Sequence, residues 1–278
     1  MTLTGKARLA GVLGWPVAHS RSPRLHGHWL AQYRIDGAYL PLSVAPEAFD
    51  EALRGLIALG FRGANVTIPH KEAAFRACDR LSPFAERVGA VNTLVVEDGV
   101  LVGSNSDGYG FLENLRDGHR DWDAGSGPAV VIGAGGAARA VVAALLEAGA
   151  PSLTLVNRTR ARAETLASDL GGSITVADWQ DRATALEGAA LLVNCTSQGM
   201  SGQAPLDLDL AALPAAALVN DLVYTPLETP LLAAARARGN PVVDGLGMLL
   251  HQARPGFEAW FGVAPEVTAE LRAAVLAD

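Results

Sequence analysis

The chain has 278 residues, of which 50% are hydrophobic and 18% are charged, and this balance excludes a disordered protein. Its net charge of −7, with no run of Lys or Arg, argues against a nucleic-acid or membrane partner. No apolar stretch approaches the roughly 18 residues of a membrane helix, and no signal peptide is recognisable. The 2 cysteines and 6 scattered histidines predict no disulfide framework and no metal site, so we expect a cytoplasmic protein.

Short apolar runs alternate with helical patterns along the first third of the chain. Strands are predicted over residues 8–13, 38–43 and 64–67, helices over 23–35 and 46–59, and two further strands within 92–102. The last two strands fold around Glu97-Asp98-Gly99, because Asp-Gly favours a tight turn. This alternation predicts an α/β unit with helices covering a parallel sheet.

A second unit begins after the turn-rich residues 116–128. Its predicted strands cover 129–132, 153–156, 190–193, 217–220 and 241–243, and its predicted helices cover 137–147 and 160–170. The helical tail, 246–276, is too short to fold alone, so we expect it to return to the first unit. The expected domains are therefore 1–106, 107–244 and a returning segment, 245–278.

The clearest motif is the loop Gly133-Ala134-Gly135-Gly136-Ala137-Ala138, which joins a predicted strand to a predicted helix. This is the setting of a Rossmann dinucleotide fingerprint. Gly133 permits the tight turn, Gly135 lets the backbone approach a pyrophosphate, and the helix N-terminus offers unpaired N–H groups. A glycine-rich turn of another α/β fold is the alternative.

The next strand runs into Asn157-Arg158-Thr159, followed by Arg160 and Arg162. An NAD enzyme usually places an acid here to bind the ribose hydroxyl, and this sequence has none. Guanidinium groups bind phosphate through paired, charge-assisted hydrogen bonds, so the pattern favours NADP. The alternative is a solvated basic helix start, which opposes the helix dipole by about 0.3–1 kcal/mol. Residues 194–197 either border the cofactor or form an ordinary polar strand end.

Three loops of the first unit carry polar residues. Ser22-Pro23 is typical of an N-cap followed by the first helical residue, and the Ser20 and Ser22 hydroxyls suit a small carboxylate. Lys71 lies in the first turn of a helix expected to open at Pro69, where a cation opposes the dipole, so we expect a functional role rather than a surface one. Asp107 has two interpretations. It is either the N-cap of the helix that follows or the partner of Lys71. The second is reasonable because Lys71 and Asp107 both follow predicted strands, and a Lys–Asp pair can give and take one proton.

Taken in order, these motifs resemble the shikimate dehydrogenase family over essentially the whole chain. They are Gly14-Trp15-Pro16 with Ser20-Arg21-Ser22-Pro23, Asn65-Val66-Thr67-Ile68-Pro69-His70-Lys71, Gly89-Ala90-Val91-Asn92-Thr93, Asn105-Ser106-Asp107-Gly108, the Gly133 loop, Asn157-Arg158-Thr159, and Gly245-Leu246-Gly247-Met248-Leu249 with Gln252. The sequence departs from the family at Gly27, which follows His26 where Asn is frequent, and at Ser106, where Thr is usual.

The resemblance implies an oxidoreductase that reversibly reduces 3-dehydroshikimate to shikimate with NADPH, in the chorismate and aromatic amino-acid pathway. The implied fold class is α/β with two domains. An N-terminal substrate-binding catalytic domain, 1–106, is completed by the C-terminal helices, 245–278, and 107–244 is a doubly wound, parallel-sheet Rossmann domain that binds NADP.

Residue roles follow from the same resemblance. Lys71 and Asp107 match the catalytic pair. The substrate-binding positions are Ser20, Ser22, Thr67, Asn92, Tyr224 and Gln252. The cofactor-binding positions are Gly133, Ala134, Gly135, Gly136, Ala137, Asn157, Arg158, Thr159, Arg162, Leu222 and Gly245.

Two alternatives stay open at this point. One is a dual quinate/shikimate dehydrogenase, with NAD as a possible cofactor, and the other is a catalytically silent NADP-binding regulator. The expected partners are a small-molecule substrate and NADP, with no nucleic acid and no membrane, and the expected assembly is a monomer or a homodimer.

Overall fold

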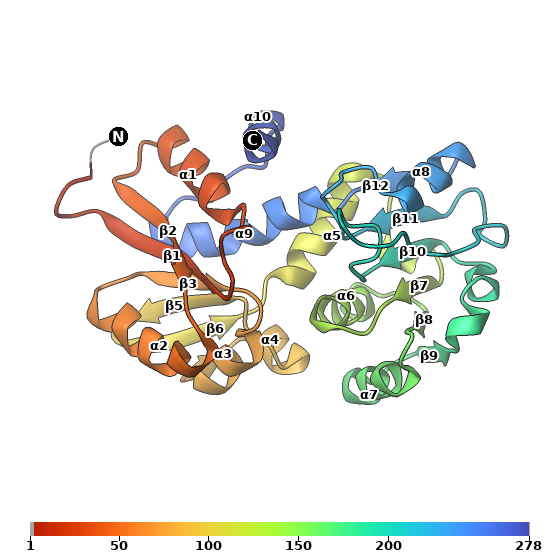
Figure 1. The fold of residues 1–278 in the computed structure, drawn as a ribbon, viewed down its shortest axis with the longest axis horizontal. Coiled ribbons are helices and arrows are strands. Elements are labelled where there is room, and N and C mark those ends of the chain that lie inside the picture. Colours follow the sequence, from red (N-terminus) through yellow and green to blue (C-terminus); the bar gives the residue numbers. More distant parts are fainter. Residues whose placement is uncertain (1–2, 278) are drawn as a thin grey trace. The chain divides into compact units, whose positions relative to one another are not determined.

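The computed structural model describes residues 3–277, which fold as two units (Figure 1). The first unit combines the chain up to Ser106 with the chain from Gln252 onwards, and the second unit is Asp107–His251. The helical tail therefore divides between the two units rather than belonging wholly to the first, because its opening residues, 246–251, group with the second unit.

The first unit is built on a six-stranded mixed sheet. Its strands are β1 (Arg8–Gly14), β2 (Gly37–Ser43), β3 (Gly63–Val66), β4 (Arg80–Leu81), β5 (Thr93–Glu97) and β6 (Val100–Ser104), in the order β2-β1-β3-β5-β6-β4. β5 runs antiparallel to β3 and β6, while the other pairs are parallel. Because only β5 is reversed, its first residue lies at the same edge as the last residues of β1, β3 and β6. The polar loops of the sequence meet at this carboxyl edge.

Helices cover both faces of this sheet. They are α1 (Ser22–Gln32), α2 (Phe49–Ala58, after a 3₁₀ turn at Pro46–Ala48), α3 (Lys71–Ala77), α4 (Pro83–Val88), α9 (Leu246–Phe261) and α10 (Ala269–Leu276). One core joins α2 to the sheet through Phe49, Leu53 and Leu56. On the opposite face Trp260 of α9 is 2% exposed, and its Nε1 donates to the Leu94 carbonyl of β5 at 2.9 Å. The returning segment thus completes the core of the first unit.

The second unit is a doubly wound parallel sheet. Its strands are β7 (Ala129–Ile132), β8 (Leu153–Val156), β9 (Ile174–Ala177), β10 (Leu191–Asn194), β11 (Leu218–Asp221) and β12 (Val242–Val243), and its helices are α5 (Asp107–Gly118), α6 (Gly136–Glu147), α7 (Arg160–Leu170) and α8 (Pro230–Ala237). The order β12-β11-β10-β7-β8-β9 reverses between β7 and β10, as in a Rossmann fold. Ligands of such sheets bind beyond the carboxyl ends of the strands at that reversal.

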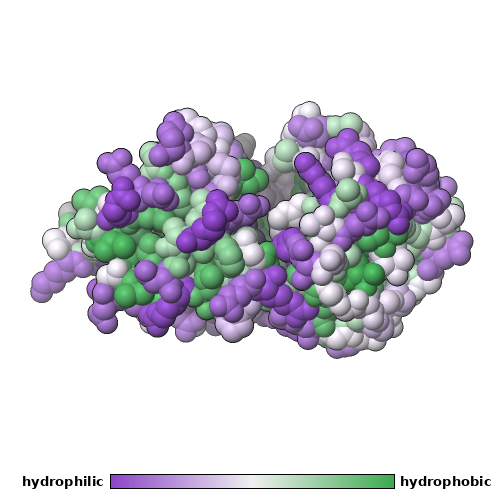
Figure 2. Space-filling view, turned by 90° about the horizontal axis from the view of Figure 1, so that it is seen from below, coloured by the Kyte–Doolittle hydropathy of each residue, from purple (hydrophilic) through white to green (hydrophobic). Residues whose placement is uncertain are grey.

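Hydrophobic and hydrophilic residues are interspersed on the face drawn in Figure 2, which views the molecule from the side of α2 and α3.

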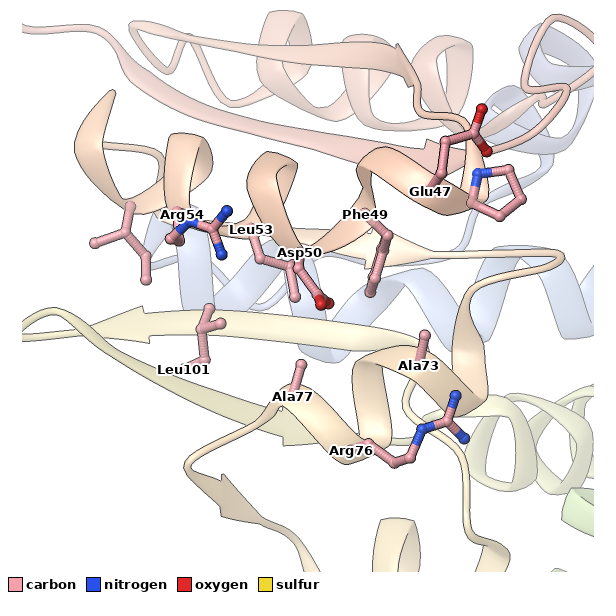
Figure 3. A pocket seen from close by; sticks show the side chains of 11 residues that line it. Glu47, Phe49, Asp50, Leu53, Arg54, Ala73, Arg76, Ala77 and Leu101 are labelled. Carbon is pink, nitrogen blue, oxygen red and sulfur yellow. The ribbon is translucent and has the colours of Figure 1, made fainter.

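On the first unit a cavity of about 580 Å³ opens between α2 and α3 (Figure 3). Phe49 and Leu53 line it from α2, and Ala73 and Ala77 line it from α3. None of the site residues predicted from the sequence lines this cavity.

Candidate active site

Asn92 is the centre of a buried hydrogen-bond cluster at the carboxyl edge of the first sheet. Its Oδ1 accepts from the Ser106 backbone N and from Thr93 Oγ1, both at 2.9 Å. Its Nδ2 donates to Ser106 Oγ at 3.1 Å and to Gln252 Oε1 at 3.4 Å. Two predicted substrate-binding residues, Asn92 directly before β5 and Gln252 from α9, are therefore brought together.

Lys71 and Asp107 each open a helix at the end of a strand-to-helix loop. Lys71 is the first residue of α3, and its carbonyl accepts from Val91 N at 3.0 Å, which places its backbone beside that of Asn92. Asp107 is only 8% exposed and opens α5 directly after Ser106. The carboxylate of Asp107 favours the positive end of a helix dipole, whereas the ammonium of Lys71 opposes it.

The loops after β1 and β3 run side by side. Thr67 N donates to the Leu13 carbonyl at 2.9 Å, and a Cβ added at Gly14 would lie 2.6 Å from Thr67 Cγ2. Within the first of these loops, Ser22 N donates to Ser20 Oγ at 3.3 Å. The two hydroxyl-bearing residues expected to hold a carboxylate are therefore neighbours, where the loop adjacent to Thr67 meets α1.

The predicted N-cap role of Ser22 is wrong. Arg21 is the N-cap of α1 and already has helical dihedral angles, φ −85° and ψ −6°, so Ser22 is the first helical residue. No side-chain hydrogen bond caps the N-terminus of α1, and the backbone N–H of Ser22 donates to Ser20 Oγ. The Ser22 side chain is 7% exposed.

In the second unit the glycine-rich loop lies at the reversal point of the sheet. Gly133 has φ +113°, and a Cβ there would lie 3.2 Å from the Cys195 carbonyl carbon after β10, so this position requires glycine. Apart from the adjoining backbone, a Cβ at Gly135 or Gly136 would meet no atom of residues 3–277 within 4 Å. Gly135 caps α6 without any side-chain hydrogen bond. Open space above exposed N–H groups is what a bound pyrophosphate requires.

The arginines that follow β8 differ in their pairing. Arg160 is bound by Glu164 at 2.7 Å and by Asp178 at 2.8 Å, so its charge is already balanced. Arg158 and Arg162 are exposed and form no salt bridge with any residue between 3 and 277. Two unpaired guanidinium groups at this position fit a 2′-phosphate, and no acid competes for them.

The loop after β11 and the start of α9 touch each other in the second unit. A Cβ at Gly245 would collide with the Leu222 carbonyl, so only glycine fits there. Tyr224 is half-buried in the same loop. After β10, Asn194 accepts from Thr196 Oγ1 at 2.7 Å and donates to Asp221 Oδ1 at 3.0 Å, which favours a structural role for this strand end.

The sequence interpretation gave Ser106 too little weight and missed Tyr39, Asn65 and Thr93. Ser106 is 5% exposed, and its Oγ also donates to the Gln252 carbonyl at 2.8 Å, so its hydroxyl links the cluster to α9. Asn65 carried a usable signal, because an amide in the middle of a buried strand must have partners. Among residues 3–277 no group of three or more His, Cys, Asp or Glu side chains is arranged to hold a metal ion.

Three family models match this chain. They are the shikimate dehydrogenase substrate binding domain over residues 12–94, shikimate / quinate 5-dehydrogenase over 122–201, and the shikimate 5′-dehydrogenase C-terminal domain over 245–276. A shikimate dehydrogenase (NADP(+)) of Paramagnetospirillum magneticum is 68% identical, covering 99% of this chain and 100% of that protein. The chain belongs to the shikimate dehydrogenase family.

Solved structures of the shikimate dehydrogenase family share the fold. The enzyme of Thermus thermophilus, solved in complex with NADP(H) and shikimate, has a TM-score of 0.86 and 39% identity, covering 96% of this chain and 98% of that one. A quinate dehydrogenase of Corynebacterium glutamicum, solved with NAD, has a TM-score of 0.90 and 30% identity, covering 97% and 99%. The expected family and fold class, α/β with a substrate-domain sheet and a Rossmann sheet, are confirmed.

No helix among the described residues combines the length and hydropathy that crossing a bilayer requires.

Proposed function

We propose that Lys71 and Asp107 are the catalytic pair of this NADP-dependent shikimate dehydrogenase, which reduces 3-dehydroshikimate reversibly to shikimate. The observation that carries the proposal is the convergence of polar residues at one sheet edge. The loops after β1 and β3, the residue before β5 and the loop after β6 all lie at that edge, and Lys71 and Asp107 extend two of these loops. The NADP dependence of close relatives supports the cofactor.

In this reaction bound NADPH supplies the hydride that reduces the substrate carbonyl. Lys71 places its ammonium at the carbonyl oxygen, stabilises the negative charge that develops there, and gives the proton that completes the alcohol. Asp107 orients Lys71 and the reacting hydroxyl. In the reverse direction the same pair takes the proton from the alcohol.

The other site residues hold the substrate. Ser20 and Ser22 donate their hydroxyl hydrogens to the substrate carboxylate, and Thr67, Asn92 and Gln252 bind the ring hydroxyls. Tyr224 is proposed as a further substrate contact. Their number suits a small, highly oxygenated ligand, because each polar group of the ligand leaves water only if a protein partner replaces it.

The residues of the second unit fit NADP. With NADP bound, the Gly133 loop with Ala134, Gly136 and Ala137 would hold the pyrophosphate. Asn157 and Thr159 would contact the adenosine ribose, and Arg158 and Arg162 would bind its 2′-phosphate. Leu222 and Gly245 would contact the nicotinamide part. The cytoplasmic location and a monomeric or homodimeric assembly stay predictions.

Replacement of Lys71 tests the catalytic role. We expect Lys71→Ala to lower kcat by orders of magnitude while the Kd for NADP changes little, because the ammonium acts on the reacting oxygen and not on the cofactor. The only other lysine of the chain is exposed Lys6, so Lys6→Ala is a matched control that should retain full activity. Wild-type turnover in Lys71→Ala would refute the assignment.

Two rival activities are separated by one spectrophotometric assay, with shikimate and quinate each tested against NADP and NAD. We expect reduction of NADP with shikimate to be the fastest combination. Equal rates with quinate would support the dual dehydrogenase, and NADP binding without any turnover would support the silent regulator.

A further inference from the structure

We propose that Tyr39, Asn65 and Thr93 are positioning residues that hold Asn92 so that it presents only its Nδ2 donor to the substrate. The inference rests on the proposed function, because it takes Asn92 as a substrate-binding residue. The three positioning residues come from three different strands, β2, β3 and β5, and their side chains form one buried relay across the first sheet.

The relay has a fixed direction at Asn65. Asn65 Nδ2 lies 3.1 Å from the carbonyl oxygen of Asn92, and a carbonyl can only accept, so the amide must turn its Nδ2 this way. Its Oδ1 then faces Tyr39, whose hydroxyl donates to it at 2.6 Å. The Tyr39 hydroxyl thus satisfies the one acceptor of Asn65 that would otherwise be buried without a partner.

The direction continues through Thr93. Thr93 Oγ1 accepts from Asn65 Nδ2 at 3.3 Å and donates its hydrogen to Asn92 Oδ1 at 2.9 Å. The Ser106 backbone N–H, which can only donate, also points at Asn92 Oδ1. Thr93 Oγ1 and the Ser106 backbone N–H, both at 2.9 Å, therefore occupy Asn92 Oδ1, and Ser106 Oγ lies 3.2 Å from it. Nδ2 faces Ser106 Oγ and Gln252 Oε1.

Water cannot take over any of these bonds, because the relay is closed to solvent. Tyr39 and Asn65 are each 6% exposed, Asn92 is 3% exposed and Thr93 is 2% exposed. The ring of Tyr39 is itself held by His26, which stacks on it at 3.9 Å with an interplanar angle of 6°. The 3.4 Å bond from Asn92 Nδ2 to Gln252 Oε1 is long, so the hydrogen in that bond is the one that a substrate oxygen would accept. Asn92 consequently recognises a substrate oxygen that accepts a hydrogen bond, and it discriminates against a group that only donates.

The test compares Thr93→Val with Thr93→Ser, because valine keeps the shape and serine keeps the hydroxyl. We expect Thr93→Val to raise KM for shikimate about five-fold or more, as for the loss of one hydrogen bond, with KM for NADP unchanged. Thr93→Ser should restore the wild-type value. Tyr39→Phe should raise the same constant to a smaller extent, while Tyr33→Phe is a matched control, since the Tyr33 hydroxyl bonds Glu266 N far from the relay.

A second readout does not depend on turnover. The side-chain amide signal of Asn92 in ¹⁵N spectra should shift in Thr93→Val and Tyr39→Phe, and stay in place in Thr93→Ser and Tyr33→Phe. Three results would overturn the relay. They are an Asn92 amide signal that does not move in Thr93→Val, an unchanged KM for shikimate in that variant, and an equal rise of KM for shikimate and for NADP. If wild-type protein fails to oxidise shikimate, the proposed function fails instead, and the amide signal still decides the relay. If Thr93→Val does not fold, Tyr39→Phe against Tyr33→Phe decides it.

Discussion

Arg158 and Arg162 are exposed guanidinium groups beside a Rossmann strand, whereas Arg160 between them is bound by two carboxylates. We expect Arg158→Ala and Arg162→Ala each to raise KM for NADP about ten-fold or more, since a hydrogen bond to a charged group contributes about 1.5–3 kcal/mol. KM for NAD should change little, because NAD lacks the 2′-phosphate. Steady-state kinetics with both cofactors checks this, and Arg160→Ala is the control; equal losses for NAD and NADP would contradict the assignment.

His26 is fully buried against Tyr39, and burial lowers the pKa of its imidazole to about 3. An unfolded histidine titrates near 6.5, so the unfolded chain gains this proton below pH 6.5 while the folded chain does not. The free energy of unfolding should therefore fall as the pH decreases from about 6.5 towards 3, by about 2 kcal/mol at pH 5.

Urea unfolding at pH 7 and pH 5 measures this contribution. The wild type and the exposed-site control His19→Phe should show it, and His26→Phe should lack it, because phenylalanine has no proton to bind. The same pH dependence in all three proteins would show that His26 does not carry it.

At the scale of elements, two glycines of the loop between β7 and α6 should affect different properties, one the stability of the fold and the other the binding of the cofactor. Gly135→Ala should leave the melting temperature unchanged, because its φ of −94° suits alanine and its Cβ would meet no atom within 4 Å in the described part of the chain beyond the adjoining backbone. The added methyl group should nevertheless raise the Kd for NADP, because it enters the space proposed for the pyrophosphate. Gly133→Ala should lower the melting temperature, because its φ is +113° and its Cβ would press on Cys195.

Thermal unfolding and cofactor titration of both variants check this contrast. If Gly135→Ala binds NADP as tightly as the wild type does, the pyrophosphate does not lie beside Gly135.

Elements with strong patterns were predictable, and weakly patterned ones were not. The hairpin around Glu97-Asp98-Gly99 is present as predicted, since local turn chemistry decides it. The helix expected to open at Pro69 exists, but it begins two residues later, at Lys71. Strand β4 has only two residues and β9 four, and neither was predicted. Each exists because a neighbouring strand supplies its hydrogen-bond partners, which no local pattern reveals.

At the scale of the whole molecule, the C-terminal segment contributes to the core of the first unit. Trp260 of α9 is 2% exposed and donates to β5, so Trp260→Ala should lower the free energy of unfolding of this unit by about 3–5 kcal/mol. Trp15 is 49% exposed, and Trp15→Ala should change the free energy of unfolding little. Urea unfolding followed by circular dichroism checks both variants, and equal stabilities would show that α9 is not part of this core.

The sequence by itself determined the family, the Rossmann loop, the absence of a ribose-binding acid after β8 and the residue types of the substrate site. These depend on short motifs whose residues are adjacent in the chain. Only the tertiary structure decided that Arg160 is neutralised by Asp178, that α9 is shared between the units, and that Tyr39 reaches Asn92 through Asn65. The physical reason is that pairing, burial and hydrogen-bond direction arise between strands and helices distant in sequence, and they are fixed only when the sheets assemble.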